Sequence, residues 1–350
     1  METDYLIIGG GLAGCTCAYL LAKEQKSVCV IEKLDSATKF KLCGGMLTPR
    51  ALKSLEQIFD DKPEDLFLQS FDSINFLTEA HSVKASNVSV RTLIRKDLDD
   101  FVLDEAKGAG AYVLDKTEMR DIDLDQRRAI GFSEDSDTVV DIKFGALIVA
   151  DGALSSTRMA LTGQTTDSIL TLEAEVQASS DEITMAFGES LKGYFWYIPH
   201  GSNAYIGCAS YGGCDSLDDE LQTFAQKMGV SYKTRRGAFM PAGSNILLQS
   251  NGVYYLGDAA GLICPVSGEG IYYALESARR LSQALLTHSS YSALMAGKVK
   301  EITHQRKNVS LFYNRVFMDT ALSLAKKTPY GSERAIKFAL KHFAGFNGDE

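Results

Sequence analysis

The chain begins with two short apolar runs that are separated by a glycine-rich turn and a segment of small residues. Residues 5–8 and 27–31 are mostly apolar without alternation, which is typical of parallel strands buried on both faces. Residues 15–23 carry small and apolar side chains and predict a helix between them. The pattern therefore predicts a strand–helix–strand unit that is complete by Lys33.

The rest of the chain mixes buried strands, helices and antiparallel strands. Weak alternation over residues 71–93 and 170–212, with Gly and Asn between the runs, predicts antiparallel strands. This mixture indicates an α/β fold. Further buried strands are predicted over 111–114, 139–149 and 252–256, and helices over 49–59, 96–108, 217–228, 270–286 and most of 290–345.

Composition limits the function classes that need to be considered. Of the 350 residues, 45% are hydrophobic and 23% charged, which excludes a disordered or collagen-like chain. The net charge of −9 argues against general nucleic-acid binding. The seven scattered cysteines predict reduced thiols, and no cluster of metal-ligating residues is visible. We expect neither a transmembrane helix nor a signal peptide, because no apolar run reaches about 18 residues and the first strand begins by Tyr5.

The turn after the first strand has the spacing of a dinucleotide-binding motif. Gly9, Gly11 and Gly14 form Gly-x-Gly-x-x-Gly, and Glu32 ends the second strand. In such a motif the first glycine permits the tight turn, the second lets a diphosphate approach the backbone, and the third lets the helix pack on the strand. A carboxylate at Glu32 can bind ribose hydroxyls. The motif predicts a dinucleotide but does not separate NAD from FAD.

Two later segments distinguish an FAD-binding chain from an NAD-binding one. Residues 146–158 run from an apolar strand into Asp151-Gly152, and residues 254–261 run from another strand into Gly257-Asp258. Following a complete βαβ unit in this order, they resemble the FAD-dependent hydroxylases and reductases built on the glutathione-reductase-type FAD fold. The resemblance implies noncovalently bound FAD, with Asp258 bonded to the ribityl chain of the flavin.

Three further features resemble the geranylgeranyl reductase group within that family. They are the Cys-Gly-Gly segment at residues 41–46, the aromatic segment at residues 194–199, and Arg95 before a helix. The chain departs from the group at Met46, where many members have a third glycine, and at His200, where many have a basic residue. Because of these two departures, the resemblance does not identify the substrate.

The resemblance implies site residues that come from distant parts of the chain. Cys43 is the expected catalytic residue, as a proton donor or in shaping the alkene site; the alternative is that it is only small enough to permit close approach to the flavin. The residues expected to contact the substrate are Tyr194, Trp196, Tyr197 and Pro199. The residues expected to bind FAD are Gly9, Gly11, Ala13, Gly14, Glu32, Lys33, Cys43, Gly44, Gly45, Met46, Arg95, Met119, Asp258, Gly268, Gly270 and Ile271.

The same resemblance implies a domain organisation. We expect a Rossmann-like FAD-binding domain with an inserted β-rich substrate domain and a helical C-terminus. The FAD-binding domain would comprise residues 1–70, 94–160 and 248–285, the substrate domain 71–93 and 161–247, and the C-terminal region 286–350.

The expected activity is FAD-dependent reduction of carbon–carbon double bonds in a prenyl or other apolar substrate, by hydride transfer from reduced flavin. NAD(P)H bound transiently, or an electron-transfer protein, would supply the electrons. One alternative is a flavin-dependent monooxygenase (hydroxylase) or halogenase on the same fold. The other is a noncatalytic FAD-binding redox sensor.

The C-terminal part of the chain is basic. Residues 298–341 hold ten Lys or Arg against three acidic residues, and residues 335–343 place apolar side chains at helical spacing. This pattern is typical of a helix packed on its own domain, and also of a helix lying on an anionic membrane surface. We therefore expect a cytoplasmic location, with peripheral contact with the inner face of a membrane as the second interpretation.

Overall fold

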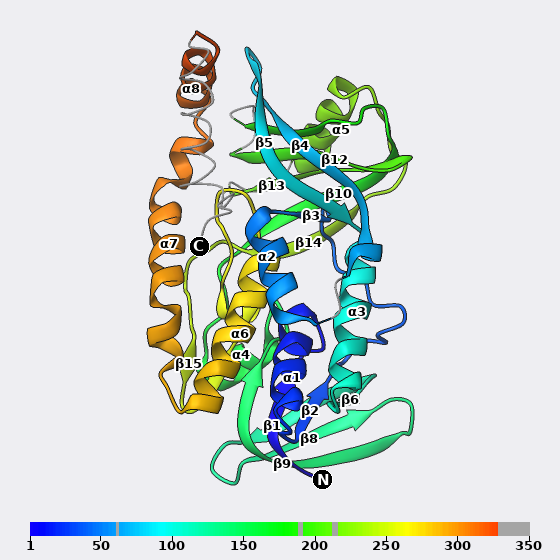
Figure 1. Cartoon of the computed structure of the whole chain (residues 1–350), viewed down its shortest axis with the longest axis vertical. Helices are drawn as coiled ribbons and strands as arrows, with labels where there is room; N and C mark the ends of the chain where they lie inside the picture. The colour runs from blue at the N-terminus through cyan, green and yellow to red at the C-terminus, as the bar shows by residue number, and fades with distance from the viewer. Residues whose placement is uncertain (61–62, 188–191, 212–215, 328–350) are drawn as a thin grey trace.

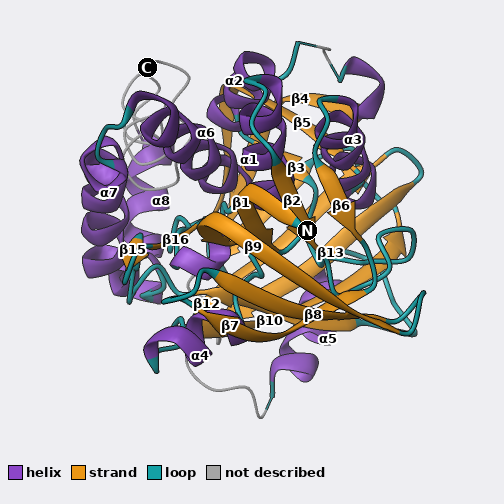
Figure 2. Ribbon diagram, turned by 90° about the horizontal axis from the view of Figure 1, so that it is seen from below, coloured by secondary structure: helices purple, strands orange, loops and turns teal. Residues whose placement is uncertain are grey.

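The computed structural model describes residues 1–60, 63–187, 192–211 and 216–327 of the chain. Over these residues the backbone forms two eight-stranded sheets, here called sheet 1 and sheet 2, with helices packed around them (Figures 1 and 2). The expected α/β class, with a Rossmann-like part, a β-rich part and C-terminal helices, is confirmed.

Sheet 1 contains the predicted strand–helix–strand unit. Its main order is β15-β16-β9-β1-β2-β6, and β1 pairs in parallel with both β2 and β9. All four residues of β2 are buried, as its apolar run predicts. The bounds are β1 (Glu2–Ile8), β2 (Val28–Ile31), β6 (Tyr112–Leu114), β9 (Thr138–Val149), β15 (Gln249–Ser250) and β16 (Val253–Tyr255).

An antiparallel extension of sheet 1 was not predicted. Strands β7 (Thr117–Asp123) and β8 (Arg128–Ser133) pair with each other, and β8 pairs with β9. Most β7 side chains are only partly buried or exposed, so this strand carries little hydrophobic signal. Its first residues nevertheless border the site described below.

Three helices lie side by side against sheet 1, with α1 between α3 and α6 (Figure 1). Helix α1 starts three residues before the predicted position because Gly11 is its N-cap. Its small residues, including Cys15 and Cys17, are buried, which lets the helix approach its neighbours closely. Helix α2 packs on α6. The bounds are α1 (Leu12–Lys23), α2 (Pro49–Ile58), α3 (Arg95–Gly108) and α6 (Ile271–Thr287).

Sheet 2 has the order β14-β10-β13-β12-β11-β4-β5-β3. One of its faces packs on α5 (Leu217–Lys227) in a separate apolar cluster. The opposite face joins the main core of the molecule. The bounds are β3 (Met46–Leu47), β4 (Phe67–Leu77), β5 (Ser82–Leu93), β10 (Ser168–Gln177), β11 (Ile183–Phe187), β12 (Gly193–His200), β13 (Asn203–Ser210) and β14 (Arg236–Pro241).

The C-terminal region is helical as far as the structure describes it. Helix α7 (Tyr291–Phe312) packs on α6, and α8 (Arg315–Lys327) follows at the end of the molecule farthest from the N-terminus (Figure 1). The amphipathic pattern at 335–343 lies outside the described residues. Among those that are described, no helix is long and apolar enough to cross a membrane. The remaining short elements are α4 (Ser156–Thr162) and the 3-10 turns η1 (Glu64–Leu66) and η2 (Gly257–Ala260).

Candidate cofactor and substrate site

A cavity of about 920 Å³ lies between the two sheets. Its size is that of a pocket for a large organic ligand. Residues from sheet 1, from the segment after β2, from sheet 2 and from the start of α6 all contribute to its walls. The predicted residues that line it are Gly9, Gly11, Ala13, Glu32, Lys33, Cys43, Gly44, Gly45, Met46, Arg95, Met119, Tyr194, Trp196, Asp258, Gly268, Gly270 and Ile271.

The three glycines of the first turn have different surroundings. Gly9 has φ +105°, and a Cβ there would lie 2.4 Å from the carbonyl oxygen of Ala150. A Cβ on Gly14 would lie 2.0 Å from the carbonyl oxygen of Gly9, so Gly14 packs beneath the turn and does not line the cavity. A Cβ on Gly11 would meet nothing within 4 Å. Only Gly11 therefore borders open space at the N-terminus of α1, where a diphosphate would bind favourably.

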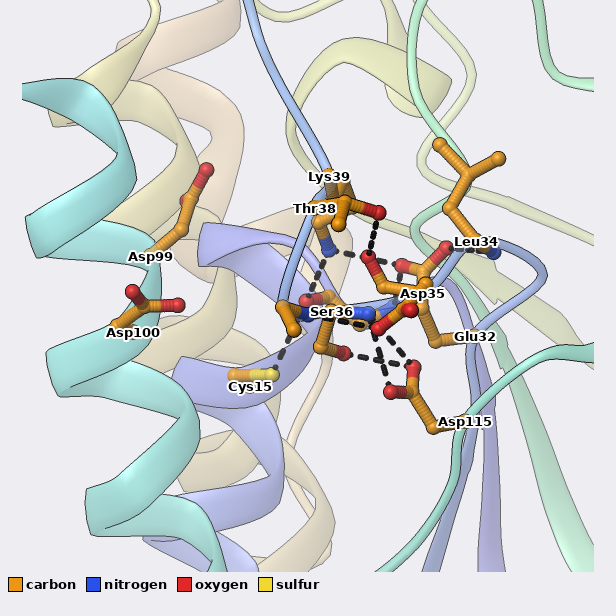
Figure 3. A network of polar contacts seen from close by, with 12 residues as sticks. Cys15, Glu32, Leu34, Asp35, Ser36, Thr38, Lys39, Asp99, Asp100 and Asp115 are labelled. Carbon is orange, nitrogen blue, oxygen red and sulfur yellow. Dashed lines mark hydrogen bonds and ion pairs between the residues drawn. The ribbon is translucent and has the colours of Figure 1, made fainter.

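Glu32 is held rigidly at the end of β2 (Figure 3). Its carboxylate accepts hydrogen bonds from the backbone N–H of Gly10 at 3.0 Å and of Leu34 at 2.8 Å. Lys39 Nζ lies 2.8 Å from Glu32 Oε2 and donates to the Gly10 carbonyl at 2.7 Å. The neighbouring Lys33 instead pairs with Glu118 at the cavity edge. Sequence reasoning missed Lys39, which sits in a connection without periodicity.

The two aspartates of the later motifs also border the cavity. Asp151 Oδ2 accepts a hydrogen bond from the Thr157 backbone N–H at 3.2 Å, whereas its Oδ1 is buried without a protein partner. Burial raises the pKa of Asp151 above its usual range, although hydrogen bonds oppose the shift. Asp258 Oδ2 forms an ion pair with Lys41 Nζ at 2.6 Å. Lys41 thus connects the segment after β2 to η2.

Arg158 ties these two motifs together. Its guanidinium is fully buried and donates to the carbonyl oxygens of Ala259 at 3.0 Å and Asn245 at 2.7 Å. The helix that carries it, α4, follows Asp151-Gly152, while Ala259 lies in η2 beside Asp258. The arginine therefore fixes the relative position of the two cavity walls.

The Cys-Gly-Gly segment lies flush against sheet 2. A Cβ on Gly44 would lie 2.7 Å from Ile198 Cδ1. Gly45 has φ +66°, and a Cβ there would lie 2.1 Å from the Leu93 carbonyl oxygen. Larger residues are excluded at both positions, so the two glycines bring half-buried Cys43 to the cavity wall. Whether Cys43 takes part in chemistry stays a prediction.

An aromatic wall faces this segment. Tyr194 and Trp196 share one face of β12, as their spacing predicts, and their ring centroids are 5.6 Å apart. Ile198 continues the same face. Two further rings stack on Tyr194: the Phe187 ring with its centroid 6.0 Å away and the Tyr313 ring with its centroid 6.1 Å away. Tyr313 follows α7, so the C-terminal region supports this wall although no motif there indicated it.

Two predicted substrate residues lie elsewhere. Tyr197 and Pro199 have the opposite parity on β12 and do not line the cavity. The Tyr197 ring belongs to the apolar cluster under α5, and its hydroxyl accepts a hydrogen bond from the Ser179 backbone N–H at 2.7 Å. The structure therefore does not bring these two predicted substrate residues to the cavity, because the alternation that places Tyr194 and Trp196 in the wall turns Tyr197 and Pro199 away.

A buried carboxylate behind the aromatic wall was missed entirely. Glu173 on β10 is 5% exposed and accepts a hydrogen bond from Trp196 Nε1 at 3.1 Å. Burial raises its pKa to about 7. In the sequence, Thr171, Glu173 and Glu175 alternate with apolar residues and predict a solvated strand face. That face is solvated at Glu175 but covered at Glu173.

Comparison with known proteins agrees with this geometry. Residues 2–213 match the family model described as FAD binding domain. The chain belongs to this family. It is 27% identical over 351 residues to geranylgeranyl diphosphate reductase of Rhodobacter capsulatus, covering 91% of this chain and 82% of that protein. It is 22% identical to digeranylgeranylglycerophospholipid reductase 1 of Methanosphaera stadtmanae, covering 97% and 86%.

A solved structure shows the same fold. It is a geranylgeranyl bacteriochlorophyll reductase-like protein from Thermoplasma acidophilum, with a TM-score of 0.79 and 20% identity, covering 99% of this chain and 97% of that one. The expected membership of the geranylgeranyl reductase group is confirmed, and the protein is an FAD-dependent oxidoreductase. The residues present fit FAD: Gly11 leaves open space at a helix N-terminus, and Asp151 offers an unpartnered oxygen at the same cavity.

Proposed function

We propose that this protein reduces carbon–carbon double bonds of a prenyl chain. The observation that carries the proposal is the apolar wall of Tyr194, Trp196 and Ile198, which faces the Cys43 segment inside the cavity that the first glycine turn also borders. A prenyl tail offers no hydrogen-bonding group, so it must be held by burial of apolar area, at roughly 25 cal/mol per Å². Names of the relatives described above support this substrate class.

The residues that would hold FAD divide into two sets. Gly11 and the start of α1 would receive the diphosphate, and Glu32 would bind a ribose of the adenosine half. Asp258, with Gly268 and Gly270 before α6, would hold the flavin half. A Cβ on Gly268 would lie 2.0 Å from the Tyr194 hydroxyl, so this glycine brings the cofactor segment against the substrate wall.

The chemistry requires hydride delivery and a proton. Reduced FAD supplies the hydride when bound; the protein supplies position, a dry pocket and the proton. Cys43 is our candidate proton donor, because its half-buried side chain lies in the cavity wall and a thiol carries an S–H proton that it can donate. The packing interpretation of Cys43 remains the alternative, and the variants in the Discussion separate the two.

The electron donor and the membrane contact are further parts of the proposal. NAD(P)H bound transiently, or an electron-transfer protein, would reduce the flavin. Peripheral contact with a membrane is supported by α8, which exposes Val316, Phe317 and Leu324, and by the basic composition of residues 298–341. We expect the protein to cosediment with anionic vesicles and not with zwitterionic ones.

The test is reoxidation of the reduced holoenzyme. Purified protein is reduced under anaerobic conditions and mixed with geranylgeranyl diphosphate or, separately, with a fully saturated analogue. We expect the oxidised flavin spectrum to return only with the unsaturated substrate, and the product to gain two hydrogen atoms for each double bond reduced. A parallel reaction is opened to oxygen. Insertion of an oxygen atom into the substrate there would instead indicate a monooxygenase, and neither product in either reaction would indicate a sensor.

The aromatic wall is tested by Trp196→Ala. Removing the indole removes apolar contact area for the substrate but leaves the Gly9–Gly14 turn intact, so KM is expected to rise while FAD occupancy stays near normal. Tyr197→Phe on the opposite face of the same strand is the control, and its KM should stay close to that of the wild type. Equal effects of the two substitutions would place the substrate elsewhere.

A further inference from the structure

A single buried carboxyl group connects the aromatic wall to the Cys43 segment. Glu173 accepts the indole N–H of Trp196 at 3.1 Å, and the backbone N–H of Cys43 is near enough to lower the pKa of this carboxyl group. The two N–H groups come from parts of the chain about 150 residues apart in sequence, one in sheet 2 and one in the connection after β2. The carboxyl group therefore interacts with both the aromatic wall and the Cys43 segment that packs against it.

The Trp196 ring has little freedom apart from this bond. A Cβ on Gly207 would lie 2.2 Å from Trp196 Cζ2, and a Cβ on Gly44 would lie 3.4 Å from Trp196 Nε1. The indole thus sits between two glycines, with its N–H directed at Glu173. Its orientation toward the cavity depends on one polar contact and two close approaches.

The surroundings of Glu173 favour a change of protonation near neutral pH. The pKa of Glu173 is raised to about 7 because burial outweighs the N–H groups of Trp196 and Cys43 and the charge of Arg236, which lower it. Arg236 lies directly across from Glu173 in the β10–β14 register. The titratable and charged groups that interact with this carboxyl group are Arg236 on β14, Tyr205 on β13 and Cys43 on the segment after β2. Glu175, two residues along β10, interacts with Tyr205 and with His200 on β12.

We propose that Glu173 is a positioning residue whose ionisation controls how firmly Trp196 and the Cys43 segment are held against each other in the cavity wall. An ionised carboxylate accepts the indole N–H in a charge-assisted bond and attracts the Cys43 N–H. A protonated carboxyl group has lost its charge and one acceptor site, so both interactions weaken. The consequence for substrate binding rests on the proposed function; the alignment itself does not.

The alignment is tested on FAD-loaded protein without substrate. Trp196 is the only tryptophan, so ¹⁵N-labelled protein gives one indole N–H resonance. Between about pH 5.5 and 9 we expect this resonance to move with a single midpoint near 7. In Glu173→Gln it should be displaced and independent of pH. Glu175→Gln removes a carboxylate two residues away on the same strand and should titrate as the wild type does.

Two results would overturn the proposal. One is a wild-type indole resonance that does not shift with pH, and the other is a Glu173→Gln resonance that still shifts with pH. Should Glu173→Gln fail to fold, Glu173→Asp keeps an ionisable group at altered distance, and its midpoint is expected to shift. An unchanged midpoint in that variant would assign the titration to another group.

Turnover gives the second readout. As pH falls from about 8.5 to 6, we expect KM for the prenyl substrate to rise about threefold to tenfold, because about one hydrogen bond loses its charge assistance. In Glu173→Gln the ratio of KM at the two pH values should be about one. If no alkene is reduced at all, the proposed function fails while the substrate-free titration still decides the role of Glu173. If the wild type and Glu173→Gln show the same ratio of KM at about pH 6 to KM at about pH 8.5, Glu173 does not position the substrate wall.

Discussion

At the scale of single residues, the glycines of the first turn have different roles: two are needed for packing and one for cofactor binding. Substituents at Gly9 and Gly14 would collide with backbone atoms: Gly9 lets the turn pass close to Ala150 at the end of β9, and Gly14 lets α1 pack on the turn and on β1. Gly11 has ordinary backbone angles, with φ −85° and ψ −175°, and space around it. A side chain there would project into the cavity and leave the protein's own contacts unchanged.

Gly11→Leu is therefore expected to yield folded but colourless protein. The leucine side chain would occupy space needed by the FAD diphosphate, and flavin absorbance after purification measures the loss. Gly108→Leu, at another glycine with open surroundings but outside the cavity, is the control and should keep FAD. Normal FAD content in Gly11→Leu would contradict the assignment of this turn.

Cys43→Ser and Cys43→Ala separate proton donation from packing. If the thiol donates the proton, both variants should keep FAD but slow substrate-dependent reoxidation of the reduced flavin, by about 10²- to 10⁴-fold. Stopped-flow absorbance under anaerobic conditions gives the rate. Rates like that of the wild type in both variants would show that Cys43 serves only as a small residue in the wall.

At the scale of elements, a buried charge network joins three segments of the C-terminal half to α2. Arg50 Nε lies 2.8 Å from Glu269 Oε2, and Arg50 Nη1 lies 2.6 Å from Glu301 Oε1 on α7. Its guanidinium also lies over the Tyr272 ring of α6, at 4.1 Å from the centroid. Glu269 stands between Gly268 and Gly270, so this network anchors the cavity segment that precedes α6.

Arg50→Met is expected to destabilise the protein by about 3–5 kcal/mol, because it leaves Glu269 buried without its counter-ion. Denaturant unfolding measures the change. Adding Glu269→Gln to that variant should recover much of the loss. Arg128→Met removes an exposed ion pair with Asp141 and should cost less than about 1 kcal/mol. Equal costs for the two arginines would contradict the role of burial.

At the scale of the whole molecule, the cavity is shared between two sheets that are joined by the segment after β2. Lys39 and Lys41 on this segment pair with Glu32 and Asp258 on the sheet 1 side. Phe40 between them lies under Arg236 of sheet 2, with the guanidinium 4.0 Å from the ring centroid. A ligand in the cavity therefore contacts both sheets and the segment that links them.

FAD removal is expected to lower the stability of the whole fold. At a concentration of free FAD about 100 times its Kd, binding contributes about 2.7 kcal/mol, which for a chain of 350 residues corresponds to a Tm decrease of roughly 4 °C on removal. Differential scanning calorimetry of holoprotein and apoprotein measures it. Apoprotein of Gly11→Leu should show no rise in Tm when FAD is added; a wild-type rise in that variant would place the cofactor outside this cavity.

The sequence alone determined the features that depend on local spacing. Buried runs predicted the parallel strands, the glycine spacing predicted the turn at Gly9–Gly14, and parity along β12 was enough to bring Tyr194 and Trp196 together. The same parity argument, applied to Tyr197 and Pro199, would have excluded them. The motifs also indicated FAD, because two strand-end aspartate segments followed the βαβ unit in order.

Only the tertiary structure decided which polar residues are covered and which distant segments meet. Glu173 and Glu175 look alike in the sequence, yet one is buried behind Trp196 and the other is exposed. Lys41 meets Asp258, and Tyr313 stacks on Tyr194, across more than 100 residues in each case. No periodic pattern in the sequence reveals such contacts, because burial of a polar group depends on which other element packs over it and not on its neighbours along the chain.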